Sequence, residues 1–239
     1  MNAMSPKRSQ ILALTCALTG LLGGSGARAS AEAVDRATRQ ALELDAQPKQ
    51  GAQLFQAQCS RCHGSAAQGN AARAIPALAG QRFKYLVRQL ANFAGEERES
   101  APMHRVLMQK EMQRPQAWVD VAAYLNNLPA THRAETGDGT RVALGRGIFH
   151  EQCASCHRAD AHGDADGFVP SLRNQHYSYL VNQLDKLADG WRHNVDEDLV
   201  LFWRSLEEKD VQATADYLSR LKGQGTPHKS LRQDGVAVD

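Results

Sequence analysis

The sequence lacks any apolar run as long as the roughly eighteen residues that a membrane-spanning helix needs. It also lacks runs of Val, Ile and Thr that alternate with polar residues, the pattern typical of β-strands. These absences argue against a membrane span and a sheet-based core, and the predicted fold class is all-α.

Residues 1–29 are expected to form a cleaved export signal. Lys7 and Arg8 precede the short apolar stretch 11–22, and small residues follow, so cleavage is predicted after Ala29. A retained membrane anchor is the alternative, which the shortness of the apolar stretch disfavours. Removal of the signal leaves 25 basic against 26 acidic residues. No basic stripe remains for a nucleic-acid partner, and none is expected.

The four remaining cysteines form two Cys-x-x-Cys pairs, and a histidine follows each pair directly. This pattern attaches c-type heme, because two thiols can bond one edge of the porphyrin while the imidazole binds the iron. Zinc binding or thioredoxin-like chemistry is the alternative for a single pair. Two pairs behind an export signal predict two covalently bound heme c groups, on Cys59, Cys62 and His63 and on Cys153, Cys156 and His157.

The second half of the chain repeats the first with an offset of 94 residues. Such self-similarity indicates a duplicated domain. We expect a first domain at 45–128, a linker at 129–140, a second domain at 141–222 and a flexible tail at 223–239. Besides the heme motifs, the matched pairs include Gly51 and Gly145, Phe55 and Phe149, Pro76 and Pro170, Tyr85 and Tyr179, and Gln89 and Gln183.

Each unit is expected to contain a helix before the heme motif, a middle helix and a C-terminal helix. The middle helices have apolar residues at helical spacing, and Pro115 suits the first turn of a helix. The predicted first and last helices are Gln50–Ala57 and Pro115–Asn126 in one unit, and Arg141–Gln152 and Glu207–Leu221 in the other.

A six-coordinate heme needs a second axial ligand, and three methionines follow the predicted signal: Met103, Met108 and Met112. Met103 comes after Pro102, which predicts an extended or turn segment that can fold over the heme. Met108 and Met112 are spaced as in a helix, where packing is the more common role. Met103 is therefore the predicted ligand of the first iron, and Met108 is the alternative.

The second unit contains no methionine, and Glu197 stands at the position equivalent to Met103. Three possibilities are open for the second iron. His193 is the favoured ligand and would give a bis-histidine heme of lower potential. His176 could serve instead, or the iron could be five-coordinate or bind water. Arg98 and Arg192 occupy matching positions before these segments, where they either contact heme propionates or are exposed.

These motifs resemble those of a class I cytochrome c domain: Gly-x-x-x-Phe before Cys-x-x-Cys-His, then Pro-x-Leu, Tyr-Leu-x-x-Gln-Leu, a methionine and Ala-Ala-Tyr-Leu. Two such domains behind a signal resemble the diheme cytochrome c4 family. The resemblance implies a periplasmic electron shuttle whose hemes face each other across the domain interface. Its partners would be a quinol-oxidising complex or dehydrogenase and a terminal oxidase or reductase, with membrane association only through them.

The missing second methionine leaves a rival hypothesis open. The favoured function is an electron carrier without substrate chemistry of its own. The alternative is a heme enzyme or sensor that uses the second iron, for example a peroxidase or a sulfur-compound oxidoreductase. Diheme peroxidases also have two Cys-x-x-Cys-His motifs, but they are longer and less regularly duplicated.

Overall fold

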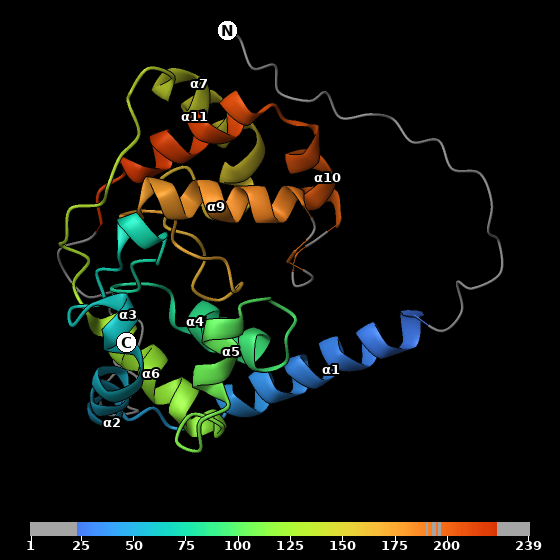
Figure 1. Ribbon diagram of the computed structural model, residues 1–239, viewed down its shortest axis with the longest axis vertical. Helices are drawn as coiled ribbons and strands as arrows, with labels where there is room; N and C mark the ends of the chain where they lie inside the picture. The colour runs from blue at the N-terminus through green and yellow to red at the C-terminus, as the bar shows by residue number, and fades with distance from the viewer. Residues whose placement is uncertain (1–22, 190, 193–194, 196, 224–239) are drawn as a thin grey trace, which may run out of the picture.

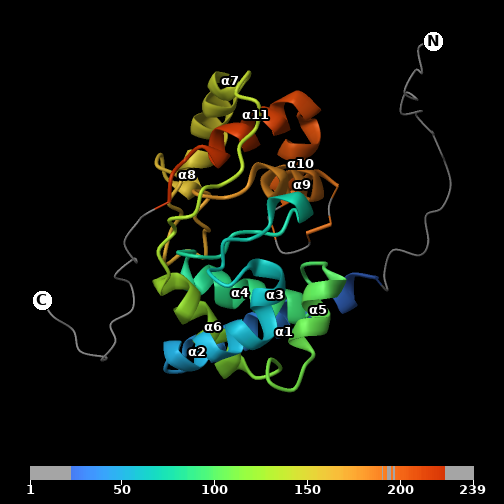
Figure 2. The same cartoon turned by 60° about the vertical axis from the view of Figure 1, so that its left-hand side comes forward.

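The computed structural model describes residues 23–189, 191–192, 195 and 197–223. Within these ranges the chain is helical, with isolated β-bridges but no strand, which confirms the all-α prediction. Two helical halves stack along the long axis, with α2–α6 in one half and α7–α11 in the other (Figures 1 and 2). In the described part, no helix is long and apolar enough to cross a membrane.

The two units have the same order of elements, except for one 3-10 turn that occurs only in the first. In each unit a short helix runs into a π-helical turn that ends at the first heme-motif cysteine, and the motif itself forms one more turn. The first unit contains α2 (Pro48–Leu54), the π-turn Phe55–Cys59, α3 (Ser60–His63), the 3-10 turn Ala71–Arg73, α4 (Phe83–Ala94), α5 (Ala101–Leu107) and α6 (Pro115–Asn127). The second contains α7 (Val142–Ile148), the π-turn Phe149–Cys153, α8 (Ala154–His157), α9 (Tyr177–Ala188), α10 (Glu197–Ser205) and α11 (Glu208–Ser219).

A glycine allows the first and last helices of each unit to cross in direct contact. A Cβ atom on Gly51 would lie 1.9 Å from the carbonyl oxygen of Asp120 in α6, and one on Gly145 would lie 1.9 Å from that of Ala213 in α11. No side chain fits there, so glycine is required at both positions. The crossing anchors the helix that leads into each heme motif on the C-terminal helix of its unit.

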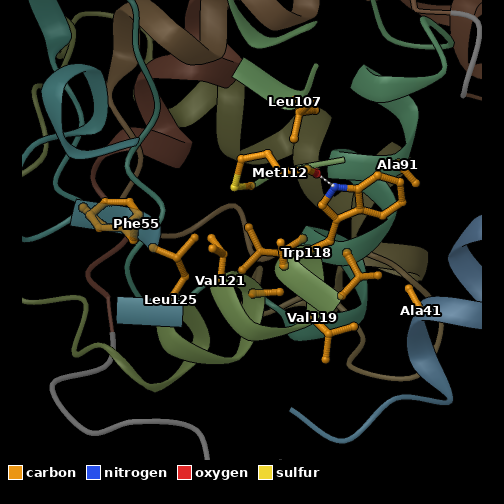
Figure 3. Close-up of a cluster of buried hydrophobic side chains, with 14 of the residues drawn as sticks. Ala41, Phe55, Ala91, Leu107, Met112, Trp118, Val119, Val121 and Leu125 are labelled. Atoms are coloured by element: carbon orange, nitrogen blue, oxygen red, sulfur yellow. Dashed lines mark hydrogen bonds between the residues drawn. The ribbon is translucent and has the colours of Figure 1, made fainter. Parts of the chain in front are cut away.

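Each unit has its own hydrophobic core. In the first, buried side chains of α1, the π-turn, α4, α5 and α6 pack together with Met112 of the segment before α6 (Figure 3). Phe55 packs against Tyr124 at 5.5 Å between ring centroids, and Phe149 packs against Tyr217 at 5.6 Å. The second core is smaller and includes Trp203 of α10.

An additional helix, α1 (Gly23–Leu42), packs against α4 and α6 of the first unit. Val34, Thr38 and Ala41 are buried on one face of this helix. Asp35 forms a 2.7 Å ion pair with Arg88 of α4. All these contacts follow the predicted cleavage site, so a chain cut after Ala29 keeps them.

Candidate heme-binding sites

The two cysteines of each motif differ in exposure. The first cysteine, Cys59 or Cys153, ends the π-turn and is half-buried; we call it the inner cysteine. The second, Cys62 or Cys156, lies on the following helical turn and is exposed. One helical turn therefore presents both thiols along one edge, as thioether attachment of a porphyrin requires. The exposed cysteine marks the edge that faces solvent.

The pKa values of the inner cysteines are raised, so these thiols stay protonated at neutral pH. Burial, and then the neighbouring Cys62 thiol, raises the pKa of Cys59 to about 12. Burial and Cys156 raise the pKa of Cys153 to about 11. Disulfide exchange needs a thiolate at neutral pH, which these raised pKa values disfavour, whereas zinc displaces thiol protons when it binds. The described residues also contain no cluster of three or more side chains that could hold a metal ion, so these sites fit thioether attachment better than thiolate chemistry.

Each motif histidine is oriented by a backbone carbonyl. His63 Nδ1 lies 3.1 Å from the Pro76 oxygen, and His157 Nδ1 lies 3.2 Å from the Pro170 oxygen. Because a carbonyl only accepts, Nδ1 carries the proton and Nε2 keeps its lone pair for iron. Burial lowers the pKa of both imidazoles despite these hydrogen bonds. The donor set of two thiols and one oriented neutral histidine fits heme c in both units.

The methionines do not lie where the sequence pattern placed them. Met103 is in α5, so the expectation of an extended or turn segment is wrong: Pro102 occupies the first turn, where proline is compatible with helix. Met108 follows the end of α5 and is 41% exposed. Met112 lies in the turn before α6 and is fully buried beside Trp118, whose Nε1 donates to the Met112 carbonyl (Figure 3).

These positions assign packing to Met112, since core side chains already enclose it. Met103 is half-buried and Met108 is exposed. Met103 was preferred because it was expected outside a helix, but in the structure Met108 is outside the helix and Met103 is within it. Both stay candidates for the first iron, with Met103 as the prediction.

His193, the predicted ligand of the second iron, lies outside the described residues. Glu197, which the repeat aligns with Met103, begins α10. His176 is buried, and both its ring nitrogens have partners: Nε2 is 2.8 Å from the Gln68 carbonyl oxygen, and Nδ1 accepts from Glu135 N–H at 3.1 Å. The structure therefore disfavours His176 as an iron ligand and shows it as a clamp between the domains.

The interface between the domains follows the repeat. Gln81 Nε2 donates to the Ser171 carbonyl at 2.9 Å and its Oε1 accepts from Ser171 N–H at 2.8 Å. Gln175 does the same with Ala77, at 3.0 and 2.9 Å. Because both glutamines and both backbone partners are related by the 94-residue offset, the two domains meet about a pseudo-twofold axis.

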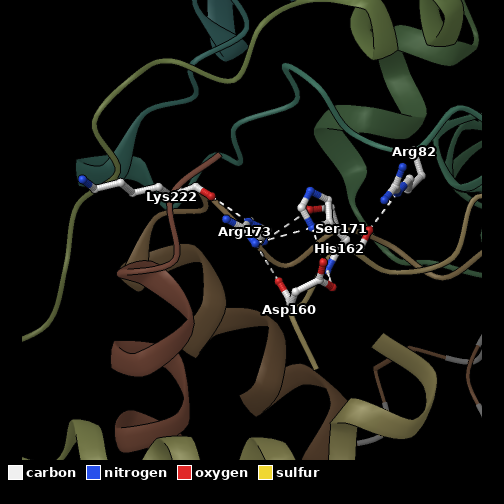
Figure 4. A network of polar contacts seen from close by, with 6 residues as sticks. All are labelled: Arg82, Asp160, His162, Ser171, Arg173 and Lys222. Carbon is white, nitrogen blue, oxygen red and sulfur yellow. Dashed lines mark hydrogen bonds and ion pairs between the residues drawn. The ribbon is translucent and has the colours of Figure 1, made fainter. Parts of the chain in front are cut away.

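A second pair of contacts follows the same symmetry. Arg82 Nε donates to the His162 carbonyl of the second domain at 2.7 Å (Figure 4), and the equivalent His176 contacts the Gln68 carbonyl of the first. His162 also pairs with Asp160, so this side of the interface is a polar network. The carbonyl groups of His162 and Gln68 are therefore equivalent under the repeat, but an arginine of the first domain binds one and a histidine of the second domain binds the other.

Two arginines occupy the middle of the interface. Arg98 and Arg192 form an isolated antiparallel bridge. The Arg98 guanidinium donates to Gln89 at 2.7 Å and to Tyr179 of the second domain at 2.9 Å, and it also bonds Gln183. Burial opposes ionisation of Tyr85, but the charges of Arg98 and Arg192 outweigh it and lower the pKa of Tyr85. Arg98 is buried rather than exposed, and the two arginines place positive charge in the interface, which would attract carboxylates.

Comparison with known proteins agrees with this geometry. The cytochrome c family model matches residues 48–129 and 142–222. The thiosulfate dehydrogenase electron acceptor of Stutzerimonas stutzeri (strain A1501) is 33% identical over 177 residues, covering 68% of this chain and 78% of that protein. Cytochrome c4 of Pseudomonas aeruginosa is 30% identical over 176 residues, covering 68% and 83%.

Among solved structures, reduced recombinant cytochrome c4 from Pseudomonas stutzeri superposes with a TM-score of 0.65 and 24% identity. The match covers 74% of this chain and 100% of that one, and it shows a shared fold. Two cytochrome c domains, each with its Cys-x-x-Cys-His motif, imply two covalently bound heme c groups. The chain therefore belongs to the cytochrome c family, as a diheme electron carrier of the cytochrome c4 type.

Proposed function

We propose that this cytochrome is a periplasmic shuttle that receives electrons from a dehydrogenase or quinol-oxidising complex and passes them to a terminal oxidase or reductase. The observation that carries the proposal is the pseudo-twofold interface, because it holds two histidine-oriented heme sites in one fixed arrangement. A carrier needs such an arrangement for transfer between hemes and needs no substrate pocket.

The residues of the chain have distinct tasks in this function. Bound heme c supplies the one-electron redox centre. The cysteines would fix the porphyrin edge, and His63 and His157, whose Nδ1 groups donate to proline carbonyls, would bind the irons. Arg98 and Arg192 provide positive charge in the interface, suited to the propionate carboxylates. A thioether from Met103 or Met108 would favour ferrous iron and raise the potential of the first heme.

The comparisons favour a sulfur-compound dehydrogenase as the donor. A relative at 33% identity is named as the electron acceptor of thiosulfate dehydrogenase. Part of a thiosulfate dehydrogenase structure from Marichromatium purpuratum also matches, at a TM-score of 0.64 and 25% identity over 40% of that chain. We therefore place thiosulfate dehydrogenase first among the donors to be tested.

The alternative is a heme enzyme or sensor at the second iron. It is supported by the absence of methionine from residues 141–222. An iron with an open or labile sixth position binds carbon monoxide or peroxide, whereas a six-coordinate carrier does not.

Purified diheme protein distinguishes these functions. A carrier should be fully reduced by a thiosulfate dehydrogenase with thiosulfate, and should then pass both electrons to a terminal oxidase or reductase without consuming peroxide. Peroxide turnover, or carbon monoxide binding to the second heme, would instead favour the enzyme or sensor. Sequencing the N-terminus of the exported protein tests cleavage after Ala29.

A further inference from the structure

The two domains differ in charge although they share a fold. Residues 45–128 contain 10 basic and 6 acidic residues, a net charge of +4, whereas residues 141–222 contain 10 basic and 13 acidic residues, a net charge of −3. Duplication alone would give equal charges. The divergence changes which charged surfaces each domain can attract.

The difference extends to the exposed edge of each heme motif. Arg61 lies exposed between Cys59 and Cys62, and the equivalent residue of the second motif is the uncharged Ser155. Among the exposed residues from 56 to 66, Arg61 is the only charged one, since the others are Gln56, Ala57, Cys62, Ser65 and Ala66.

The second edge has the opposite balance. Its exposed charged residues from 150 to 160 are Glu151, Arg158 and Asp160, which gives one net negative charge. Glu151 replaces the alanine at position 57, and Asp160 replaces the alanine at position 66. At both heme-motif edges, the sign of the local net charge is therefore the same as that of the whole domain.

We infer that the first domain docks, at the edge marked by Arg61 and Cys62, a redox partner with an acidic surface. This inference rests on the proposed carrier function and adds the chemistry of the partner. Cys62 is exposed, so a heme bonded to it would be reached by an approaching partner at this edge. A positive charge in a segment without acidic residues attracts an anionic surface and accelerates encounter at low ionic strength.

Small oxidants of opposite charge test the inference on the intact diheme protein. Hexacyanoferrate(III) is an anion and tris(phenanthroline)cobalt(III) a cation, and each takes one electron from a ferrous heme, which becomes ferric. At low ionic strength, Arg61→Glu should slow oxidation of the first heme by hexacyanoferrate(III) about threefold to tenfold and accelerate oxidation by the cobalt complex. About 0.5 M salt should remove most of both effects.

Two variants make the test specific. Arg61→Lys keeps the charge and should retain the wild-type rates. Arg146→Glu makes the same charge change at an exposed site of the second domain and should change the first-heme rate less than about twofold. Equal effects of Arg61→Glu and Arg146→Glu, or none from either, would overturn the acidic-partner inference alone. Wild-type hemes that react with neither oxidant would overturn the carrier function as well.

Discussion

Gln81 and Gln175 occupy equivalent positions in the two domains, and each clamps the backbone of the other domain through a donated and an accepted hydrogen bond. Gln175→Leu would leave the N–H and carbonyl of the buried Ala77 without these partners. An unpaired buried polar group costs about 1–3 kcal/mol. We expect a loss of about 2 kcal/mol or more in the free energy of unfolding, measured by denaturant titration.

Gln152→Leu is the matched control, because Gln152 is exposed. Its effect should lie within about 0.5 kcal/mol of zero. Similar losses for both variants would contradict the role assigned to the glutamine clamp.

Replacing each methionine by alanine tests ligation of the first iron. Met103→Ala should abolish the near-infrared methionine-to-iron band of the ferric protein and lower the potential of that heme, because thioether ligation favours ferrous iron. If Met108→Ala abolishes the band instead, the ligand assignment moves to Met108. Met112→Ala should keep the band and lose about 2–5 kcal/mol of stability, since Met112 is core.

Arg98→Gln should lower the midpoint potentials of both hemes. Arg98 is buried and contacts Tyr179 and Gln183 of the second domain, so its charge disfavours the more positive ferric state on either side. A change of about 1 kcal/mol corresponds to roughly 40 mV for one electron. Spectroelectrochemical titration measures both potentials, with Arg105→Gln on the exposed surface as control. A shift confined to one heme would contradict coupling across the interface.

His193→Ala tests the second iron. If His193 is the distal ligand, the wild-type ferric protein has two low-spin hemes and the variant has one low-spin and one high-spin heme, as counted by paramagnetic resonance. His176→Gln should leave the spin states unchanged, because both ring nitrogens of His176 already have protein partners. A high-spin heme in the wild type would instead support an open site.

The free energy of unfolding should decrease as the pH is lowered through the range in which free histidine titrates. Burial, and then the nearby His176, lowers the pKa of His132 in the folded protein. The unfolded state therefore takes up this proton first, and the free energy of unfolding declines as pH falls below about 6.5. His132→Asn should make this decline shallower between pH 7.5 and 5.5, measured by denaturant titration. An unchanged slope would show that His132 is not involved.

Much of the fold could be predicted because the repeat records it. The helix predicted at Pro115–Asn126 is observed as Pro115–Asn127, and the one predicted at Glu207–Leu221 as Glu208–Ser219. The short helices α5 and α10 were not predicted: α5 has a proline in its first turn, and α10 exposes apolar side chains such as Leu201. Pro102 led to the prediction of an extended or turn segment, although proline is tolerated in the first turn of a helix.

The functional sites were also only partly predictable from the sequence. Cysteine and histidine spacing is local chemistry, so both attachment motifs could be read from the sequence. The reciprocal contacts of Gln81 and Gln175 join residues 90 or more positions apart. Only the equivalence of the two glutamines under the 94-residue offset could have indicated them. Helix α1 had no repeat partner, which is why nothing in the duplicated pattern predicted it.

The segment between the domains, expected as a linker, is held along its length. Glu135 accepts from Tyr177 N–H at 3.0 Å and from Ser178 N–H at 2.9 Å, and Gly139 N–H donates to Asp216 at 2.7 Å. A free tether would let the two hemes meet at an effective concentration set by its length. Here that description does not apply, because the hydrogen bonds of the linker and the interface hold the two heme sites together. We therefore expect the rate of transfer between the hemes to be independent of linker length.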